Sequence, residues 1–274
     1  MLKQRIITAV VLAALFFSTL FGLATWYFAG FALFALMTAV YEWGKLTGLT
    51  PGASVVYAAV VFVLGALLFF YGGFDRSSGF PPAAVLMLCG TSAAFWILVA
   101  PVWLKQGWTT RITPLMLVLG AVLILAMWMA MTQLHARSPW LLLATMLVVW
   151  IADTAAYFAG RRFGRRKLAP VISPGKSWEG VYGGLVGVGV YAVLLLLLSP
   201  LGADPHVSRP LVVVAALVLA MVSVVGDLFE SWLKRQAGVK DSGSTLPGHG
   251  GVLDRIDALL PALPVATLLV VLMS

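Results

Sequence analysis

The stretch IITAVVLAALFFSTLFGLATWYFAGFALFALMTAVY, residues 6–41, contains no Asp, Glu, Lys or Arg. A helix rises about 1.5 Å per residue, so about 20 apolar residues cross the roughly 30 Å hydrocarbon core of a bilayer. The run is therefore long enough for two membrane-spanning helices, with a break near Gly22 to Thr25. Lys3 and Arg5 precede it as in a signal peptide, but the run is too long and no A-x-A site follows, so we expect a retained first span.

Other charge-free segments recur along the chain, at 46–74, 77–104, 112–136, 180–203, 210–226 and 258–274, and residues 139–160 are interrupted only by Asp153. Lipid offers no hydrogen bonds to a bare backbone, and unbroken apolar runs lack the alternation of barrel strands. The sequence therefore predicts an all-α, polytopic transmembrane bundle of about nine spans. The expected spans are 5–22, 25–43, 54–72, 83–104, 112–134, 139–160, 179–199, 210–230 and 256–273.

The charged residues predict the orientation of this bundle. Only 10% of residues are charged, against about a quarter in soluble domains. If the N-terminus is cytoplasmic, the outside loops carry only Arg76, Arg137 and Arg209, and all other basic residues lie inside. This bias predicts a membrane protein with its N-terminus on the cytoplasmic side and its C-terminus outside. The net charge of +8 then faces anionic lipid, which argues against a nucleic-acid partner.

The acids divide the chain into two regions. Residues 1–137 form about five helices with little charge, whereas residues 138–274 form about four helices with two polar cytoplasmic loops. Helices six, eight and nine bring Asp153, Asp227 and the pair Asp254 and Asp257 to one depth near the cytoplasmic boundary. Acids inside spans usually face a polar interior and are functional, so a shared cation would explain the group.

The first polar window, residues 153–180, ends in SPGKSWEG. It is not a phosphate loop of the Walker type, because Pro170 stands where a glycine is required and no strand is expected before it. Ser173 and Pro174 suit the N-cap and first turn of a helix, where amides and Lys176 could hold a phosphate. A capped turn that binds no ligand is an equally good interpretation of this segment. The nearby RRFGRRK run is typical of a basic cluster that only sets the orientation of the neighbouring spans.

The second window, residues 226–257, has the residue types of phosphoryl chemistry: hard carboxylate ligands, basic side chains and a glycine-rich segment. Zinc is disfavoured, because His249 has no cysteine partner near it. A serine hydrolase is disfavoured because G-x-S-x-G is absent. By itself, His249 could cap a turn, and Lys240 beside Asp241 could be a solvated pair.

The pattern S-x-L-K-R-x4-K-D-x-G-x2-L-P-G-H-G-G-x2-D-R-I-D, from Ser231 to Asp257, resembles the signature of the phosphatidate cytidylyltransferases. The 153–180 window resembles two further elements of that family, and Glu42-Trp43-Gly44 resembles a weaker one. The resemblance implies an enzyme integral to the bacterial cytoplasmic (inner) membrane, with its active site on the cytoplasmic side. It implies that Mg²⁺, held at Asp227 and Asp254, is used to make CDP-diacylglycerol and pyrophosphate from CTP and phosphatidate. It leaves a second cation open.

This reaction needs cations to bring two polyanions together. We expect Asp227 and Asp254 to hold the metal, with His249, Lys234 and Lys240 also catalytic. His249 and the neighbouring glycines would position the α-phosphate or protonate pyrophosphate. The expected substrate-binding residues are Ser173, Lys176, Ser177, Arg235, Gly248, Gly250, Gly251, Arg255, Asp153, Asp241 and Asp257.

Two alternatives remain from the sequence. A cation-coupled secondary transporter would also use acids near helix ends, although no internal repeat is visible. A CTP-dependent transferase or a kinase for another membrane lipid would share much of the motif chemistry, whereas a CDP-alcohol phosphotransferase lacks its D-G-x2-A-R signature here. The glycines Gly183, Gly184, Gly187 and Gly189 could pack helices within one chain or in a homodimer.

Overall fold

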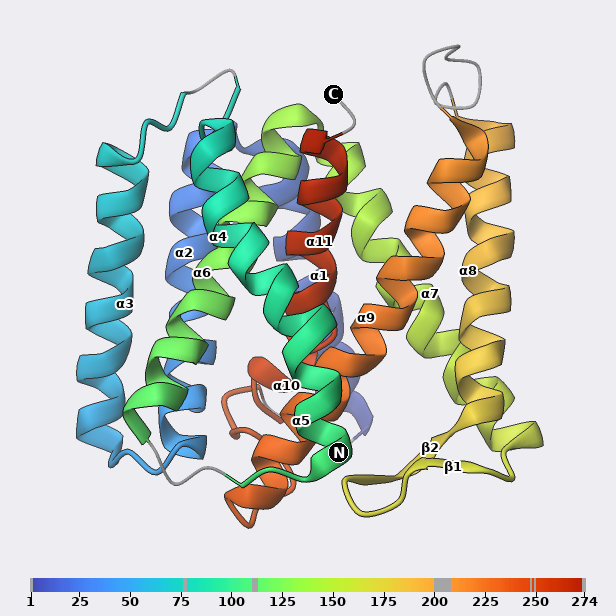
Figure 1. The fold of residues 1–274 in the computed structure, drawn as a ribbon. Coiled ribbons are helices and arrows are strands. Elements are labelled where there is room, and N and C mark those ends of the chain that lie inside the picture. The colour runs from blue at the N-terminus through green and yellow to red at the C-terminus, as the bar shows by residue number, and fades with distance from the viewer. Residues whose placement is uncertain are drawn as a thin grey trace.

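The computed structural model describes residues 2–75, 78–109, 113–199, 208–246, 248 and 250–272, with side chains from residue 7 onward. Its helices run up and down between two faces (Figure 1). In chain order the elements are α1 (Leu2–Gly22), α2 (Thr25–Leu46), α3 (Pro51–Tyr71), α4 (Pro82–Ala94), the π-helical turn η1 (Phe95–Val99), α5 (Ala100–Gln106), α6 (Thr113–Arg137), α7 (Pro139–Phe163), β1 (Lys167–Ala169), β2 (Ser173–Ser177), α8 (Trp178–Leu198), α9 (Arg209–Gln236), α10 (Leu253–Ile256) and α11 (Leu259–Leu272).

The two faces differ in what they carry. The N-terminal end of α1, the β1–β2 hairpin and the loop between α9 and α10 lie at the lower face of Figure 1, which we call the site face. The loop between α3 and α4 and the end of α11 lie at the opposite face. We call the described residues 237–246, 248 and 250–252 the glycine loop, and the described residues 72–75 and 78–81 the far loop.

Seven helical stretches in the described ranges are long and apolar enough to cross a membrane. They are α3, the continuous α4–η1–α5 stretch, α6, α7, α8, α9 and the α10–α11 stretch. The apolar part of α1 is shorter, and α2 ends in the charged residues Glu42 and Lys45. The expected polytopic helical bundle is confirmed, and about nine spans is compatible with these helices.

Three expected spans differ in detail from the structure. The span at 83–104 is interrupted by η1, because Pro101 has no N–H to continue the α-helical ladder. The last span is divided at residues 257–258, where Pro261 cannot donate to the carbonyl of Asp257. Helix α9 extends to Gln236, so the basic pair Lys234 and Arg235 belongs to a helix and not to the loop in which we placed it.

The segment around Ser173 was predicted wrongly. Instead of capping a helix, Ser173 begins strand β2, which pairs antiparallel with β1 in a two-stranded hairpin. The N-cap of α8 is Ser177, whose Oγ accepts a hydrogen bond from Gly180 N at 3.2 Å. Pro174 has no N–H for a helical ladder but is tolerated in the edge strand of so short a sheet.

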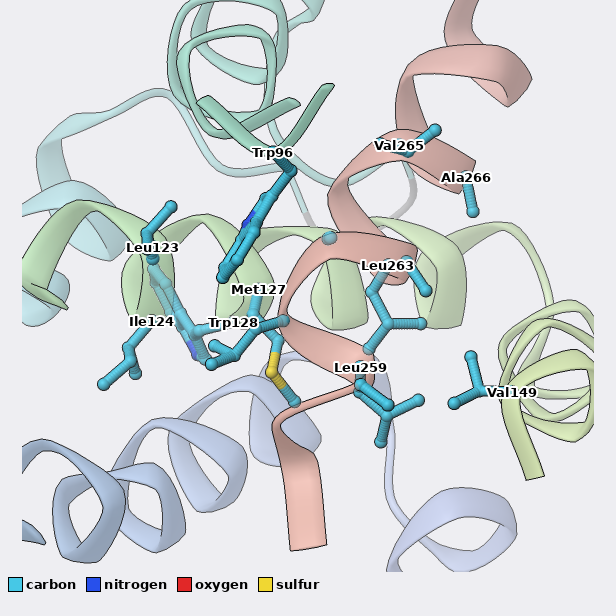
Figure 2. Packing of buried hydrophobic residues seen from close by; sticks show 14 of the residues in the cluster. Trp96, Leu123, Ile124, Met127, Trp128, Val149, Leu259, Leu263, Val265 and Ala266 are labelled. Atoms are coloured by element: carbon cyan, nitrogen blue, oxygen red, sulfur yellow. The ribbon is translucent and has the colours of Figure 1, made fainter. Parts of the chain in front are cut away.

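The apolar core lies where α6 packs against α2, α4 and α11. Figure 2 shows buried side chains of this core, among them Trp96 of η1, Met127 of α6 and Leu263 of α11. The buried Trp128 indole donates to Ala29 O at 2.8 Å, and the Trp43 indole donates to Met116 O at 2.8 Å. Satisfied indoles of this kind fix the helices relative to one another, because an unmade hydrogen bond in an apolar core is costly.

Helices α7 and α8 pack in a different way, through small residues. A Cβ at Gly183 would run into Ala159, one at Gly187 would run into Ala155, and one at Gly184 would meet the carbonyl of Ala152. These glycines therefore allow close backbone approach within one chain. Gly189 meets nothing within 4 Å.

Candidate active site

Lys176 reaches from strand β2 to the acidic part of α9. Its Nζ lies 2.5 Å from Asp227 Oδ2, and both side chains are partly exposed. Asp153 of α7 and Asp257 of the α10–α11 turn are electrostatic neighbours of both members of this pair. The structure thus brings carboxylates from three separate spans to the site face, as we expected, and places a lysine among them.

A second lysine, Lys234, is shared by two acids. Its Nζ lies 2.5 Å from Glu230 Oε2, one helical turn earlier on α9, and 2.6 Å from Asp254 Oδ1. Glu230 is buried, and in the part of the chain described its Oε1 has no hydrogen-bonding partner, so Lys234 at Oε2 is the group that meets this carboxylate. Because a buried carboxylate is costly without a compensating charge, the ion pair with Lys234 is its main stabilisation. Glu230 was among the acids of the second window, but we did not assign it to the site.

Asp254 lies in the first turn of α10 and is held by the glycine loop. Its Oδ2 accepts hydrogen bonds from Ser242 N and Gly251 N, both at 2.9 Å, and lies 3.0 Å from Ser242 Oγ, whose single proton is shared with Glu42. Gly250 has φ +80°, and a Cβ there would lie 2.9 Å from the same oxygen. The loop backbone can close around this carboxylate because glycine adopts the left-handed conformation and leaves room.

Glu42 is a second acid that we did not assign to the site, although Glu42-Trp43-Gly44 resembles a weak element of the family. It lies in the last turns of α2, is 1% exposed, and accepts four hydrogen bonds from the glycine loop and the start of α10. The donors are Ser242 Oγ at 3.0 Å, Thr245 Oγ1 at 2.6 Å, Val252 N at 3.1 Å and Leu253 N at 2.8 Å. The available signal was a lone acid at the end of an apolar span, which is costly unless it has partners.

Several predicted substrate-binding residues lie around the acids and do not contact them. Arg235 donates from Nε to Ile172 O and from a terminal nitrogen to Val239 O, both at 3.3 Å, which ties the hairpin to the end of α9. Ser173 is part of the hairpin and Ser177 is occupied as a helix cap. Four further predicted residues are exposed at the site face: Lys240, Asp241, Gly248 and Arg255.

The predicted catalytic residue His249 lies outside the described residues. Its neighbours Gly248 and Gly250 both have positive φ, +77° and +80°, and Gly250 forms a bridge with Leu246. The backbone on either side of position 249 therefore has the tight turns expected of a segment that approaches an anion closely.

The acids at the site face are hard oxygen donors of the kind that Mg²⁺ prefers. Within the described residues, no group of three or more His, Cys, Asp or Glu side chains is arranged to hold a metal ion alone. Mg²⁺ does not need such a cage, because one or two carboxylates with water and substrate phosphates suffice. Asp227 offers a partly exposed carboxylate, and among the described residues Asp254 Oδ1 is contacted by Lys234 alone. This oxygen donor set fits Mg²⁺ once the lysines turn from the carboxylates to phosphate.

Two cavities lie near this region. One of about 480 Å³ opens between the ends of α2, α6 and α9, with Lys45, Thr47 and Gln236 among its lining residues, and it contains none of the predicted site residues. A much smaller one, of about 20 Å³, lies between α7, α8 and α9 and is lined by Asp153. The second cavity places an acid of the site beside a gap between spans.

Comparisons with known proteins agree with these observations. Residues 3–273 match the cytidylyltransferase family. The phosphatidate cytidylyltransferase of Pseudomonas aeruginosa is 42% identical over 97% of this chain and 95% of its own length. The phosphatidate cytidylyltransferases of Haemophilus influenzae and Brucella suis are 37% and 38% identical, over 96% and 95% of this chain and 96% and 90% of their own lengths. The membrane bundle whose acids and lysines meet at one face belongs to the cytidylyltransferase family.

Proposed function

We propose that this protein transfers the cytidylyl group of CTP to phosphatidate, giving CDP-diacylglycerol and pyrophosphate for phospholipid synthesis. The observation that carries the proposal is the meeting of Asp227, Asp254, Lys176 and Lys234 at one face of a membrane bundle. Phosphatidate stays in the leaflet with its phosphate at the boundary, and CTP arrives from the aqueous phase. Both substrates can therefore meet at the depth where these side chains gather.

In the reaction, an oxygen of the phosphatidate phosphate forms a bond with the α-phosphorus of CTP. The bond from that phosphorus to the oxygen bridging the β-phosphate breaks, and pyrophosphate leaves with the electron pair. The nucleophile is already an anion, so no strong general base is required. The main task of the protein is to neutralise and orient two polyanions.

The lysines of the site suit this task. Lys176 and Lys234 each neutralise a carboxylate now, and each can turn to a phosphate oxygen when a polyphosphate enters. Arg235 and Lys240 add positive charge at the edge of the site. His249 we retain as a group that positions the α-phosphate or protonates pyrophosphate, and the glycine loop as the backbone beside it.

Mg²⁺ is the proposed cofactor, and Asp227 and Asp254 are the residues proposed to hold it. The ion supplies charge neutralisation across the phosphates when bound. Asp254 keeps Oδ1 for this role because its Oδ2 is fixed by the glycine loop, which holds the carboxylate in one orientation. The identity of a second cation and the presence of a homodimer stay as predictions.

The site face is proposed to be cytoplasmic, with the bundle in the bacterial inner membrane. Support comes from the basic residues, most of which lie in segments on the side of the N-terminal end of α1. Intact bacterial cells expressing single-cysteine variants, with the cysteine in the hairpin or in the far loop on a Cys89→Ser background, would test this by labelling with an impermeant thiol reagent added before or after the membrane is opened. Labelling of the far loop from the cytoplasmic side would show that the orientation is opposite to the proposed one.

The direct test of activity is to incubate the purified protein with phosphatidate, labelled CTP and Mg²⁺. We expect one cytidine-bearing lipid and one pyrophosphate per turnover, with loss of both on adding a chelator. Asp227→Asn serves as the matched inactive variant, because it keeps the side-chain shape and removes the charge. Release of pyrophosphate without a cytidine lipid would contradict the proposal.

The same assay separates the alternative functions. A transferase for another membrane lipid would show no product with phosphatidate but a cytidine product with a polyprenyl or archaeal-type lipid acceptor. A secondary transporter would instead move solute across sealed vesicles without consuming CTP. The position of the acids at one face, and not at the bundle midplane, favours the enzyme.

A further inference from the structure

The glycine loop and the start of α10 donate hydrogen bonds to the carboxylate of Glu42. It comes from the N-terminal half of the chain, about 200 residues before its partners, and it is 1% exposed. Within the described residues no ion pair is formed by Glu42. Its buried charge is therefore stabilised by hydrogen-bond donors alone.

Each carboxylate oxygen of Glu42 accepts one hydroxyl and one backbone N–H. Oε1 accepts from Thr245 Oγ1 and Val252 N, and Oε2 accepts from Ser242 Oγ and Leu253 N. A glutamine amide in the same place would have its NH₂ facing either Val252 N–H or Leu253 N–H, whichever way it is turned. Two hydrogen-bond donors would then face each other. Only a carboxylate satisfies this set of donors.

The loop is shaped to admit this carboxylate. A Cβ at Gly243 would lie 2.6 Å from Glu42 Oε1, and a Cβ at Gly251 would meet both Glu42 Oε2 and Ser242 Oγ. Two glycines of the loop thus lie against one carboxylate. Their close approach is an observation independent of the hydrogen bonds, and it shows that the loop backbone is folded around Glu42.

One residue links this anchor to the proposed metal ligand. The hydroxyl of Ser242 lies 3.0 Å from Glu42 Oε2 and 3.0 Å from Asp254 Oδ2, and Ser242 N and Gly251 N donate to that same Asp254 oxygen. Leu253, whose N–H binds Glu42, directly precedes Asp254. Movement of the Glu42 carboxylate would therefore move Asp254 through both the loop and the start of α10.

We propose that Glu42 is a positioning residue for the cytidylyl transfer. It holds the glycine loop so that Asp254 presents Oδ1 toward the bound polyphosphate and metal, and it does not touch the substrates itself. This inference rests on the proposed function. It gives α2, in the half of the chain that carries little charge, a role in positioning the site.

The experiment compares Glu42→Gln and Glu42→Ala with a matched control, Gln133→Ala. Gln133 is also buried and also holds a loop, but at the opposite face. For each variant we would measure the Mg²⁺ concentration at half-maximal rate, kcat, KM for each substrate, and thermal unfolding. A substitution near a metal ligand typically costs about 10- to 100-fold in metal affinity or activity.

For both Glu42 variants we expect a rise of about 10-fold or more in the half-maximal Mg²⁺ concentration and a lower kcat, with KM for phosphatidate unchanged. The Gln133 variant should unfold at a lower temperature with Mg²⁺ dependence like that of the wild type. Wild-type Mg²⁺ dependence and kcat in a folded Glu42→Gln protein would overturn the inference. So would a loss of activity that only follows the unfolded fraction.

A second measurement keeps the inference independent of the activity. Without substrates, hydrogen exchange of the amides of Val252 and Leu253 should be faster in Glu42→Gln than in the wild type, while the α6 amides stay unchanged. Unchanged exchange would contradict the anchoring role even if the wild type made no CDP-diacylglycerol. Faster exchange together with an inactive wild type would instead reject the proposed function and leave the anchor in place.

Discussion

Two loops at opposite faces of the bundle are each held by one buried side chain from another part of the chain. Glu42 holds the glycine loop at the site face, and Gln133 holds the far loop. Gln133 Oε1 accepts from Phe80 N at 2.8 Å, and its Nε2 donates to Ser78 O at 3.0 Å. The glycine loop and the start of α10 offer four hydrogen-bond donors to the buried side chain, and this set of donors requires a carboxylate. The far loop offers one donor and one acceptor, and this pair requires an amide.

The two loops also use glycine in the same way. A Cβ at Gly79 of the far loop would run into Gln133, just as a Cβ at Gly251 would run into Glu42 and Ser242. The difference lies in what each loop carries. Asp254 follows the glycine loop, whereas no predicted site residue lies in the far loop. Damage to the first should therefore reduce activity, and damage to the second should reduce stability.

The largest effect should come from Asp254→Asn. The substitution removes the charge proposed to hold the metal and points an NH₂ at Lys234 or at the loop donors, so turnover should fall by about 10³-fold or more. Product formation by detergent-purified protein would measure this, with insertion and unfolding temperature as controls. Near-normal synthesis of CDP-diacylglycerol would reject the metal role of Asp254.

The next largest effect should come from Gln133→Glu. This substitution gives the far loop a carboxylate, the group that holds the glycine loop, in place of its amide. One oxygen would then face the carbonyl of Ser78, and a charge would be buried without a partner, so the free energy of unfolding should fall by about 2–4 kcal/mol. Denaturation in detergent would measure the loss. The folded fraction should keep its turnover, and a large fall in kcat per folded molecule would show that the two faces are coupled.

These comparisons show what the sequence could predict. Charge-free runs were enough to predict a helical membrane bundle and the approximate spans. The depth of Asp153 and Asp227 followed from helix rise, and that of Asp257 from its place at the start of the last span. The resemblance marked Glu42-Trp43-Gly44 only weakly, and the role of Glu42 was not predicted because its partners lie about 200 residues away in the chain. The hairpin was missed because SPGKS has the composition of a helix start, and only its pairing with residues 167–169 decides for strand.

Gly251→Ala should have an intermediate effect on activity. The added Cβ must displace the Ser242 hydroxyl or the Glu42 carboxylate, so we expect about a 10- to 100-fold loss of turnover in a chain that still folds. The matched variant is Gly79→Ala, which meets Gln133 and also forces a φ of +82° on alanine. It should lower the unfolding temperature and leave kcat unchanged. Equal losses of kcat in both would mean that the glycine contacts are only structural.

The smallest effect should come from Thr245→Val, which removes one of the four donors to Glu42. The hydrogen bond is short, 2.6 Å, but Thr245 is exposed, so water can replace part of it. Removing such a bond typically costs about 0.5–1.5 kcal/mol, which is roughly a 2- to 10-fold change in the population of the ordered loop.

Kinetics at low and at saturating Mg²⁺ would separate two origins of this change. A deficit that disappears at saturating Mg²⁺ would mean that the loop acts through the metal ligand, as proposed. A deficit that persists unchanged would mean that the loop acts on the nucleotide directly, because saturating metal restores the site only when Asp254 is the group that has been displaced.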